Sequence, residues 1–208
     1  MTAVQRTRNS GGHCETGFEN EILNASMTPA LPAASLRPAT EDDCASLAAL
    51  SIEVWLGTYL RNGINRGFSE DVLGTYTPGH FIEALQDPAE HLIVSQNQEG
   101  IDGYIRISHG RPSPAGGPSR TEISTLYVQP RHQGRNIGWC LLDAGLQTCL
   151  SNAWDAPWLA ANPQNNRAIA FYLRHGFELA GLTHFQIQDN RYPNDVLQYC
   201  GRWPPAET

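Results

Sequence analysis

The amino-acid sequence predicts a mixed α/β fold in which strands and helices alternate within one domain. Three observations support this prediction. Residues 123–128 are apolar and β-branched, as in an interior strand, and a glycine-containing turn leads from them into an apolar helix. Residues 91–96 and 101–108 flank a turn that contains Asn and Gly, which predicts a β-hairpin. Residues 165–174 have the pattern of a helix, and two further strands follow it.

The elements before the hairpin are predicted from helix caps and breakers. Residues 35–38 form a short first strand. Thr40 is a helix N-cap, because the acidic residue Asp43 follows three positions later, and the amphipathic helix runs to about Leu60. Residues 61–85 are interrupted by glycines and a Pro-Gly pair, so they are predicted to form loops with one short helix.

Four segments complete the element order. Residues 111–120 are rich in Pro, Gly and Ser and are predicted to be a flexible connection. Residues 157–161 form a strand after the central helix. Residues 177–188 and 195–203 form a final pair of strands.

The predicted domain covers residues 36–203, with a mobile arm over residues 1–35 and a short tail over residues 204–208. Met27 precedes the domain, and we hypothesise that translation naturally starts there. The 40% apolar residues suffice for a core, and no run reaches the ~18 apolar residues of a membrane helix. The net charge of −7 argues against a nucleic-acid partner. It would attract cationic amines, although solubility alone explains it equally well.

The cysteines predict a reducing compartment. Their spacing contains neither a Cys-x-x-Cys pair nor a metal-ligand pattern. An odd number without a secretory leader predicts free thiols in the cytoplasm. No metal is predicted. The five residues are Cys14, Cys44, Cys140, Cys149 and Cys200.

The turn between residues 128 and 137 has the clearest chemistry. Pro130 cannot continue a central ladder, and helical spacing of apolar residues begins near Asn136. Gly134 and Gly138 permit a positive φ or the close approach of a ligand, and the first N–H groups of a helix point beyond its start. These features predict a phosphate cradle, with an ordinary strand–turn–helix junction as the alternative. Two arginines flank the turn, Arg131 and Arg135.

This turn also resembles a known signature. Gln133-Gly134-Arg135-Asn136-Ile137-Gly138 is similar to the Arg/Gln-x-x-Gly-x-Gly signature of the GNAT superfamily of N-acetyltransferases. Asn136 stands where the signature normally has glycine. Because asparagine is the non-glycine residue most tolerant of the left-handed region, the loop is expected to keep its shape. The departure bears on the affinity for the cofactor.

A second segment, residues 165–177, resembles the family's other signature, Asn-x-x-Ala-x-x-Phe/Leu-Tyr-x-x-x-Gly-Phe. Asn165 is predicted to cap a helix and Gly176 to end it. Phe171 and Tyr172 share a helical face, for which core packing is the alternative explanation. The two signatures occur in the family's order, and the resemblance covers residues 36–203.

The resemblance implies a central mixed, mostly antiparallel sheet that is splayed between its fourth and fifth strands and flanked by helices on both faces. It also implies acetyl-CoA, or a related acyl-CoA, as co-substrate. Pantetheine would bond to the strand before the turn, the turn would hold the pyrophosphate, and the second signature's asparagine would line the groove. The residues assigned to this co-substrate are Leu126, Tyr127, Val128, Gln133, Gly134, Arg135, Asn136, Ile137, Gly138 and Asn165.

The implied function is transfer of an acetyl group to a primary amine of a small molecule or peptide by direct attack. At pH 7 an amine with a pKa of about 10.4 is protonated, so its attack needs a base, and the departing thiolate needs an acid. Tyr172 matches the tyrosine that protonates the CoA sulfur in many members. His109, near the end of the preceding strand, is a reserve base.

Glu122 matches the catalytic glutamate of the histone-acetyltransferase type. It lies six residues before Val128 and is expected on the same face of the strand. Partial burial would raise its pKa toward neutrality. The alternative is a carboxylate at the edge of the sheet that pairs with Arg106 or Arg120.

Acceptor selectivity is expected from the first helix and residues 57–80. Small amines, amino acids, antibiotics and peptide N-termini all remain open, and so does a homodimer. Five residues are candidates for a cation-binding wall, with core and surface packing as the alternative for each: Glu53, Trp55, Tyr59, Asp71 and Tyr76.

Two other functions are weighed against the enzyme. A non-catalytic regulatory module would bind acyl-CoA but release no thiol with any amine. A nucleotide-binding α/β protein is disfavoured, because neither Gly-x-x-x-x-Gly-Lys-Ser/Thr nor Gly-x-Gly-x-x-Gly occurs. No membrane partner is predicted.

Overall fold

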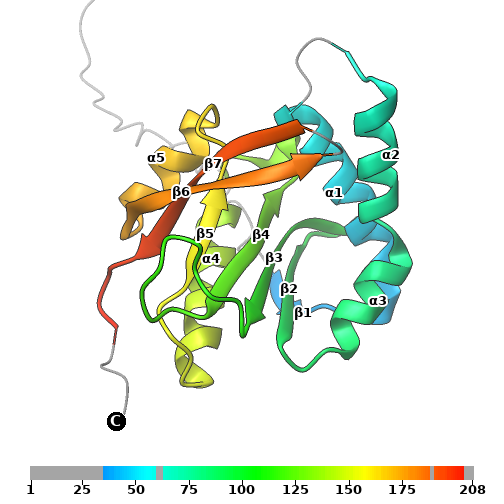
Figure 1. The fold of residues 1–208 in the computed structure, drawn as a ribbon. Helices are drawn as coiled ribbons and strands as arrows, with labels where there is room; N and C mark the ends of the chain where they lie inside the picture. The colour runs from blue at the N-terminus through cyan, green and yellow to red at the C-terminus, as the bar shows by residue number, and fades with distance from the viewer. Residues whose placement is uncertain (1–34, 60–62, 188–189, 204–208) are drawn as a thin grey trace, which may run out of the picture. The chain divides into compact units, whose positions relative to one another are not determined.

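A seven-stranded β-sheet organises the residues that the computed structural model describes, 35–59, 63–187 and 190–203 (Figure 1). The strand order is β1-β2-β3-β4-β5-β7-β6, and every neighbouring pair is antiparallel except β4–β5. The predicted mixed, mostly antiparallel sheet is therefore confirmed. The predicted tail and the arm up to residue 34 lie outside the described residues, and Ser35 belongs to the first strand.

The described elements follow the predicted alternation of strands and helices. The strands are β1 (Ser35–Pro38), β2 (Glu90–Gln96), β3 (Ile101–His109), β4 (Thr121–Val128), β5 (Trp158–Ala161), β6 (Phe177–Ile187) and β7 (Asn190–Tyr199). The helices are α1 (Cys44–Tyr59), α2 (Arg66–Thr75), α3 (Pro78–Gln86), α4 (Ile137–Ser151) and α5 (Asn166–Arg174). Two short 3₁₀ turns, η1 (Glu41–Asp43) and η2 (Pro130–His132), precede α1 and follow β4.

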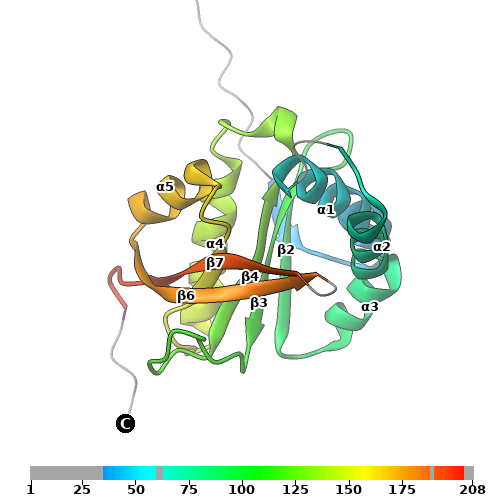
Figure 2. The same cartoon turned by 45° about the horizontal axis from the view of Figure 1, so that its top comes forward.

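Helices cover both faces of the sheet, as predicted (Figure 2). On one face α1 and α3 pack against β2 and β3 around Leu47, Phe81 and Val94. On the other face α4 and α5 pack around Leu141 and Tyr172. None of the described helices is both long and apolar enough to cross a membrane.

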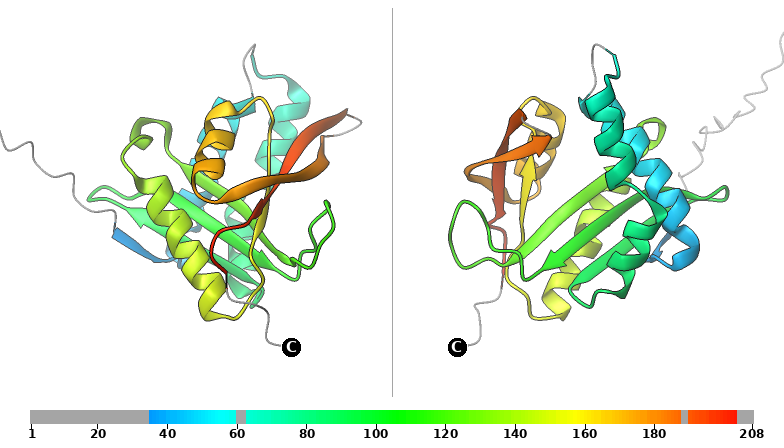
Figure 3. Two further views of the ribbon diagram at one scale, coloured as in Figure 1. Left: turned by 90° about the vertical axis from the view of Figure 1, so that its left-hand side faces the viewer. Right: turned by 45° about the vertical axis from the view of Figure 1, so that its right-hand side comes forward.

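The central strands β4 and β5 part almost immediately. Within the described residues they share one register pair, Glu122 with Trp158, and the two halves of the sheet then separate (Figure 3). Among the described strands, the rest of β4 shares register pairs with β3 alone. The predicted splay between the fourth and fifth strands is confirmed.

A β-bulge at Ser124 changes the face that Glu122 presents. Glu122 lies opposite Ser108 of β3, and Val128 lies opposite Gly103. Ser108 and Gly103 are an odd number of positions apart on β3, so their side-chain directions are opposite. The prediction that Glu122 and Val128 share a face is wrong, because the extra residue inverts the alternation between them.

The segment 61–85 contains two helices rather than one. Asn65 caps α2 by accepting a hydrogen bond from the N–H of Phe68 at 3.0 Å. Thr77 caps α3 by accepting from the N–H of His80 at 3.2 Å, and Pro78 occupies the first turn. Proline is well tolerated there because its missing N–H would have no partner in a helix. The Pro-Gly pair therefore starts a helix instead of breaking one.

The final hairpin is longer on its second strand than predicted. β7 begins at Asn190 rather than at residue 195 and ends at Tyr199 rather than at residue 203. Pro193 lies beyond the last residue of β7 that pairs with β5, Asp195, so it removes no hydrogen bond from a central ladder. The predicted first strand matches β6, except that Gln188 lies outside the described residues.

The connection predicted to be flexible is held at both ends. Arg111 donates its N–H to the carbonyl of Arg120 at 2.8 Å, and Ser113 donates to Ser119 at 3.1 Å. The hydroxyl of Ser119 also donates to the carbonyl of Ala156 at 2.7 Å. The β3–β4 connection is therefore anchored next to the start of β5.

The predicted cap at Thr40 gives a test of stability. Asp43 accepts two hydrogen bonds from Arg37, at 2.7 and 2.8 Å, and one from the N–H of Thr40 at 2.8 Å. The Arg37 guanidinium and the Thr40 donors lower the pKa of Asp43 to about 2. A lowered pKa stabilises the fold at neutral pH, and this stabilisation is lost as pH falls from the ordinary value toward about 2.

We therefore expect Asp43→Asn to lower the free energy of unfolding at pH 7 by at most about 2 kcal/mol, since solvent around Arg37 screens the pair. The difference from the unsubstituted protein should shrink below pH 4, where the native carboxylate takes up its proton. Urea denaturation at several pH values measures it. Asp42→Asn, at an exposed position of the same turn, is the matched control. A constant difference at every pH would contradict the assignment.

Candidate active site

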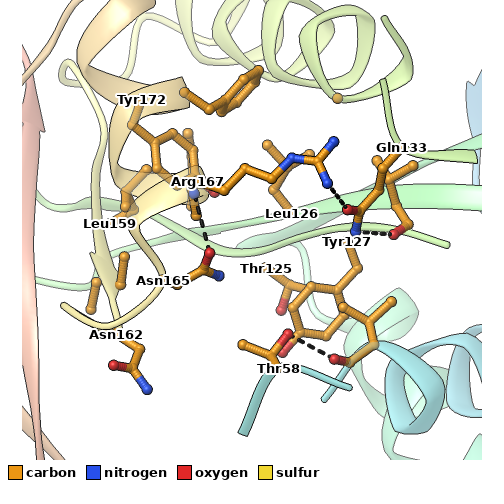
Figure 4. Close-up of a pocket in the computed structure, with 18 of the residues that line it drawn as sticks. Thr58, Thr125, Leu126, Tyr127, Gln133, Leu159, Asn162, Asn165, Arg167 and Tyr172 are labelled. Atoms are coloured by element: carbon orange, nitrogen blue, oxygen red, sulfur yellow. Dashed lines mark hydrogen bonds between the residues drawn. The ribbon is translucent and has the colours of Figure 1, made fainter. Parts of the chain in front are cut away.

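A pocket opens where β4 and β5 part. Its volume is about 780 Å³. One side is formed by β4, the turn after it, the first turn of α4, β5 and α5. The other side is formed by the second half of α1, by Tyr76 after α2 and by the β6–β7 hairpin. Figure 4 shows Tyr127 of β4, Asn165 and Tyr172 around this space.

The turn after β4 presents backbone donors to the pocket. Gly134 has φ +83° and Asn136 has φ 65°, so both occupy the left-handed region. For Asn136, which stands where the signature has glycine, this is the expected conformation. Within the described residues, the N–H groups from Gly134 to Trp139 donate no hydrogen bond. Cys140 is the first to donate back into the helix, to the carbonyl of Asn136 at 3.1 Å. The turn therefore leaves a run of backbone N–H groups without hydrogen bonds inside the described residues, and phosphate binding there stays a prediction.

A chain of hydrogen bonds ties α5 to the end of β4. Arg167 donates to the side-chain oxygen of Gln133 at 2.9 Å, and the Gln133 amide donates to the carbonyl of Val128 at 3.1 Å (Figure 4). Asn165 caps α5, and its side-chain oxygen accepts from the N–H of Ala168 at 3.2 Å. Arg167 is absent from the predicted site because it fills a variable position of the second signature.

Glu122 lies half-buried where β4 meets β5. Burial raises its pKa, and the neighbouring charge of Glu90 raises it further, whereas Arg111 and Arg106 lower it. Arg106 donates to Glu90 at 2.8 Å, so its ion pair is with that buried carboxylate rather than with Glu122. The hydrogen bond of the Arg120 side chain goes to the carbonyl of Gly110. Glu122 is therefore a partly desolvated carboxylate at the pocket wall.

Tyr172 of α5 also lines the pocket. It is buried, and its ring packs edge-to-face against Phe171 and Phe177, with centroids 5.2 and 5.5 Å apart. Its ring thus belongs to the core while its edge reaches the pocket, so core packing and a role at the pocket do not exclude one another. His109 does not line the pocket, because it stacks on Trp154 at 4.7 Å.

Most of the predicted site residues meet at this pocket. Arg135 and Ile137 do not: Arg135 is exposed, and Ile137 faces the core beneath α4. The predicted residues that line the pocket are Glu122, Leu126, Tyr127, Val128, Gln133, Gly134, Asn136, Gly138, Asn165 and Tyr172.

The predicted cation-binding wall is only partly assembled. Trp55 and Tyr76 line the pocket, whereas Glu53 and Asp71 do not. Glu53 instead accepts a hydrogen bond from Gln129 at 2.9 Å and lies 3.6 Å from Arg131. The side chain of Tyr59 lies outside the described residues.

Two pocket residues on the final hairpin are absent from the predicted site, Phe185 of β6 and Asn194 of β7. Asn194 lies outside the predicted bounds of the last strand, whereas Phe185 lies within a strand that was predicted correctly. A signal was nevertheless present, because Phe185 is a large aromatic residue among polar neighbours and is 40% exposed.

Comparison with known proteins identifies the family. Residues 57–177, more than half of the chain, match the model of the acetyltransferase (GNAT) family. The chain belongs to the GNAT family. An uncharacterized N-acetyltransferase of Mycobacterium bovis is 29% identical to this GNAT protein over 109 residues, which cover 51% of this chain and 65% of the relative. N-alpha-acetyltransferase RimI of Mycobacterium tuberculosis is 30% identical over 107 residues, which cover 51% and 64%. The match therefore spans less than two thirds of these relatives.

Solved structures share the GNAT fold. The PaiA N-acetyltransferase of Thermoplasma acidophilum, solved with coenzyme A, superposes with a TM-score of 0.65 at 15% identity and covers 81% of this chain and 99% of its own. YncA of Salmonella typhimurium, solved with its cofactor acetyl-CoA, has a TM-score of 0.61 at 18% identity and covers 84% and 98%. At these identities the likeness concerns the fold alone.

Proposed function

We propose that this GNAT protein transfers an acetyl group from acetyl-CoA to a primary amine. One observation carries the proposal: a single pocket joins a cradle of free N–H groups, a half-buried carboxylate with a raised pKa, and a tyrosine on the facing helix. Family membership and the neighbours solved with coenzyme A and acetyl-CoA support it. A cytoplasmic location, expected from the cysteine pattern, stays part of this proposal.

The described residues fit acetyl-CoA as co-substrate. The N–H groups of Gly134 to Trp139 suit pyrophosphate oxygens, since they lie at a helix start and have no other acceptor. Beyond Glu122 the described residues of β4 and β5 share no register pair, which leaves a gap between the two strands for an amide-containing pantetheine chain. Arg167 and Gln133 hold these two regions together. When bound, acetyl-CoA supplies the thioester carbonyl and a thiol leaving group.

Glu122 and Tyr172 divide the proton transfers between them. Glu122 accepts a proton from the ammonium group, directly or through water, and so exposes the nitrogen lone pair. The nitrogen forms a bond to the thioester carbon, and the carbon–sulfur bond then breaks. Tyr172 supplies a proton to the departing sulfur. The products are an N-acetyl amine, free coenzyme A and one proton released to solvent. The nitrogen loses two protons in all: Glu122 passes the first to solvent, and the second, lost once the carbon–nitrogen bond has formed, replaces the proton that Tyr172 gives to sulfur.

The direct test is release of free thiol from acetyl-CoA across a panel of primary amines, repeated with Tyr172→Phe. Enzyme activity requires at least one amine to accelerate release above hydrolysis. Calorimetry with coenzyme A runs in parallel. Saturable binding without amine-dependent release would favour a non-catalytic acyl-CoA-binding module, and failure to bind at millimolar coenzyme A would overturn both functions.

The turn itself provides a second prediction. Asn136 sits at φ 65°, where an L-residue such as alanine is disfavoured by about 1–2 kcal/mol. We expect Asn136→Ala to weaken coenzyme A binding by roughly tenfold and Asn136→Gly to preserve it. Calorimetric dissociation constants decide the matter, with Asn152→Ala, an exposed cap at the other end of α4, as control. Equal affinity of the alanine variant would show that the loop geometry is not used.

A further inference from the structure

A row of aromatic rings from four elements runs beside the pocket, and two of the rings line it. Trp55 of α1 packs against Phe68 of α2 with ring centroids 5.6 Å apart, and Phe68 packs against Tyr192 of β7 at 6.0 Å. Tyr192 is the register partner of Phe185 on β6, so their side chains lie next to each other on one face of the hairpin. We call these four residues the aromatic wall.

The aromatic wall reaches the pocket at both of its ends. Trp55 and Phe185 line the pocket, whereas Phe68 and Tyr192 pack in the Trp55 cluster without lining it. Trp55 is buried, but Phe185 is 40% exposed. A large aromatic ring that is open to a pocket favours a ligand surface, because flat apolar ligands bury it. The wall also links α2 to the hairpin, because Phe68 packs against Tyr192.

Two phenol rings continue the aromatic surface along the pocket. The hydroxyl groups of Tyr76 and Tyr127 lie 3.2 Å apart, and both residues line the pocket. Tyr127 is braced from the sheet side by Tyr104, with ring centroids 5.8 Å apart. The space near Trp55 is therefore bordered by aromatic rings from α1, β4, β6 and the end of α2.

Charge in the pocket is unevenly distributed. Among the described lining residues, Glu122 is the carboxylate. The cationic or imidazole side chains come from α5 and its C-cap: Arg167, Arg174 and His175. On the aromatic side of the pocket, the described residues therefore supply no second carboxylate to bind a diamine and no guanidinium to bind a carboxylated amine. This arrangement favours the binding of an acceptor that has one ammonium group and is otherwise uncharged.

We propose that the acceptor is a small primary amine whose short uncharged chain ends in an aromatic ring. The proposal rests on the proposed acetyl transfer and specifies its substrate class. The ammonium group points toward Glu122, and the ring packs against the aromatic wall. Aliphatic polyamines, free amino acids and peptide N-termini lack one or more of these features.

Matched acceptors test the class. 2-Phenylethylamine should show kcat/KM about tenfold above that of 2-cyclohexylethylamine, which has a similar shape without the π-system. The ratio of kcat/KM for 2-phenylethylamine to that for spermidine should be larger still. Phenylalaninamide should have a higher kcat/KM than phenylalanine, because phenylalanine carries a carboxylate that the amide lacks. A tetrapeptide that begins with phenylalanine completes the set.

A pair of variants on one strand tests the surface. We expect Phe185→Ala to raise KM for 2-phenylethylamine by about tenfold while KM for acetyl-CoA stays constant. Leu182→Ala is the control, since Leu182 is 69% exposed on the same strand and does not line the pocket. Its kinetics should match those of the unsubstituted protein. A circular dichroism melt confirms that both variants are folded.

The outcomes separate this inference from the proposed function. If spermidine, the cyclohexyl analogue, phenylalanine or the peptide is acetylated as well as 2-phenylethylamine, acetyl transfer stands and the aromatic class is wrong. The same holds if Phe185→Ala leaves KM for the amine unchanged. If coenzyme A binds but no amine is acetylated, both the substrate class and the transferase activity fail.

Discussion

Replacement of Glu122 by glutamine is expected to lower kcat by about 10²- to 10⁴-fold, the usual contribution of a general base. Glutamine keeps the shape of the side chain but cannot accept a proton at neutral pH. The stability of the fold should not decrease. Burial raises the pKa of Glu122, so its charge opposes folding at neutral pH, and the neutral amide removes that cost. The thermal unfolding temperature should therefore be equal or higher, which separates loss of chemistry from loss of structure.

Glu178→Gln is the matched control, because Glu178 is exposed on β6 and does not line the pocket. It should leave kcat unchanged. A Glu122→Gln variant that retains full activity would remove this residue from the mechanism and leave water or another group as the base.

The pH dependence gives an independent check on the same carboxylate. The base acts when it is deprotonated, so kcat/KM should fall as pH drops through the raised pKa of Glu122. Arg111 lowers this pKa, and its side chain is mostly exposed. Arg111→Gln should therefore move the acidic limb to higher pH. Both proteins are assayed with the same amine, so that the ionisation of the acceptor affects the two pH profiles equally. A shift to lower pH would contradict the assignment.

Tyr172→Phe is expected to lower kcat by roughly 10²-fold, at the lower end of general acid catalysis. The change removes the hydroxyl group and leaves the ring, whose contacts with Phe171 and Phe177 support α5. KM for acetyl-CoA and the melting temperature should change little for that reason. Steady-state kinetics with saturating amine measures the effect on kcat.

Tyr199→Phe serves as the control for Tyr172, because Tyr199 packs against the same core cluster but does not line the pocket. Its kcat should be unchanged. If the two variants lose activity equally, the loss reports packing beneath the pocket rather than a proton supplied to sulfur.

The two signatures could be predicted in structural detail because each acts locally. The left-handed Asn136, the cap at Asn165 and the positive φ of Gly176 are all decided by a few adjacent residues. The same holds for the hairpin of β2 and β3. The splay of the sheet was implied by the family resemblance, and the single pairing of Glu122 with Trp158 confirms it.

The remaining features depend on segments that are distant in sequence. The bulge at Ser124 is a mismatch between two paired strands, so the alternation of β4 alone does not reveal it. The bond from Arg167 to Gln133 and the placement of Phe185 at the pocket likewise require α5 and β6 to be positioned first. Periodicity within one segment carries no information on such encounters.

The single pairing between β4 and β5 also has a dynamic consequence. Backbone amides of β4 that face the gap are open to solvent-catalysed hydrogen exchange, whereas those bonded to β3 are protected. A ligand that occupies the gap would act as a substitute strand. Exchange at Leu126 and Val128, followed by mass spectrometry or NMR, would then slow on saturation, while exchange in α3 would not change. The cofactor would in that case complete the secondary structure of the protein that uses it.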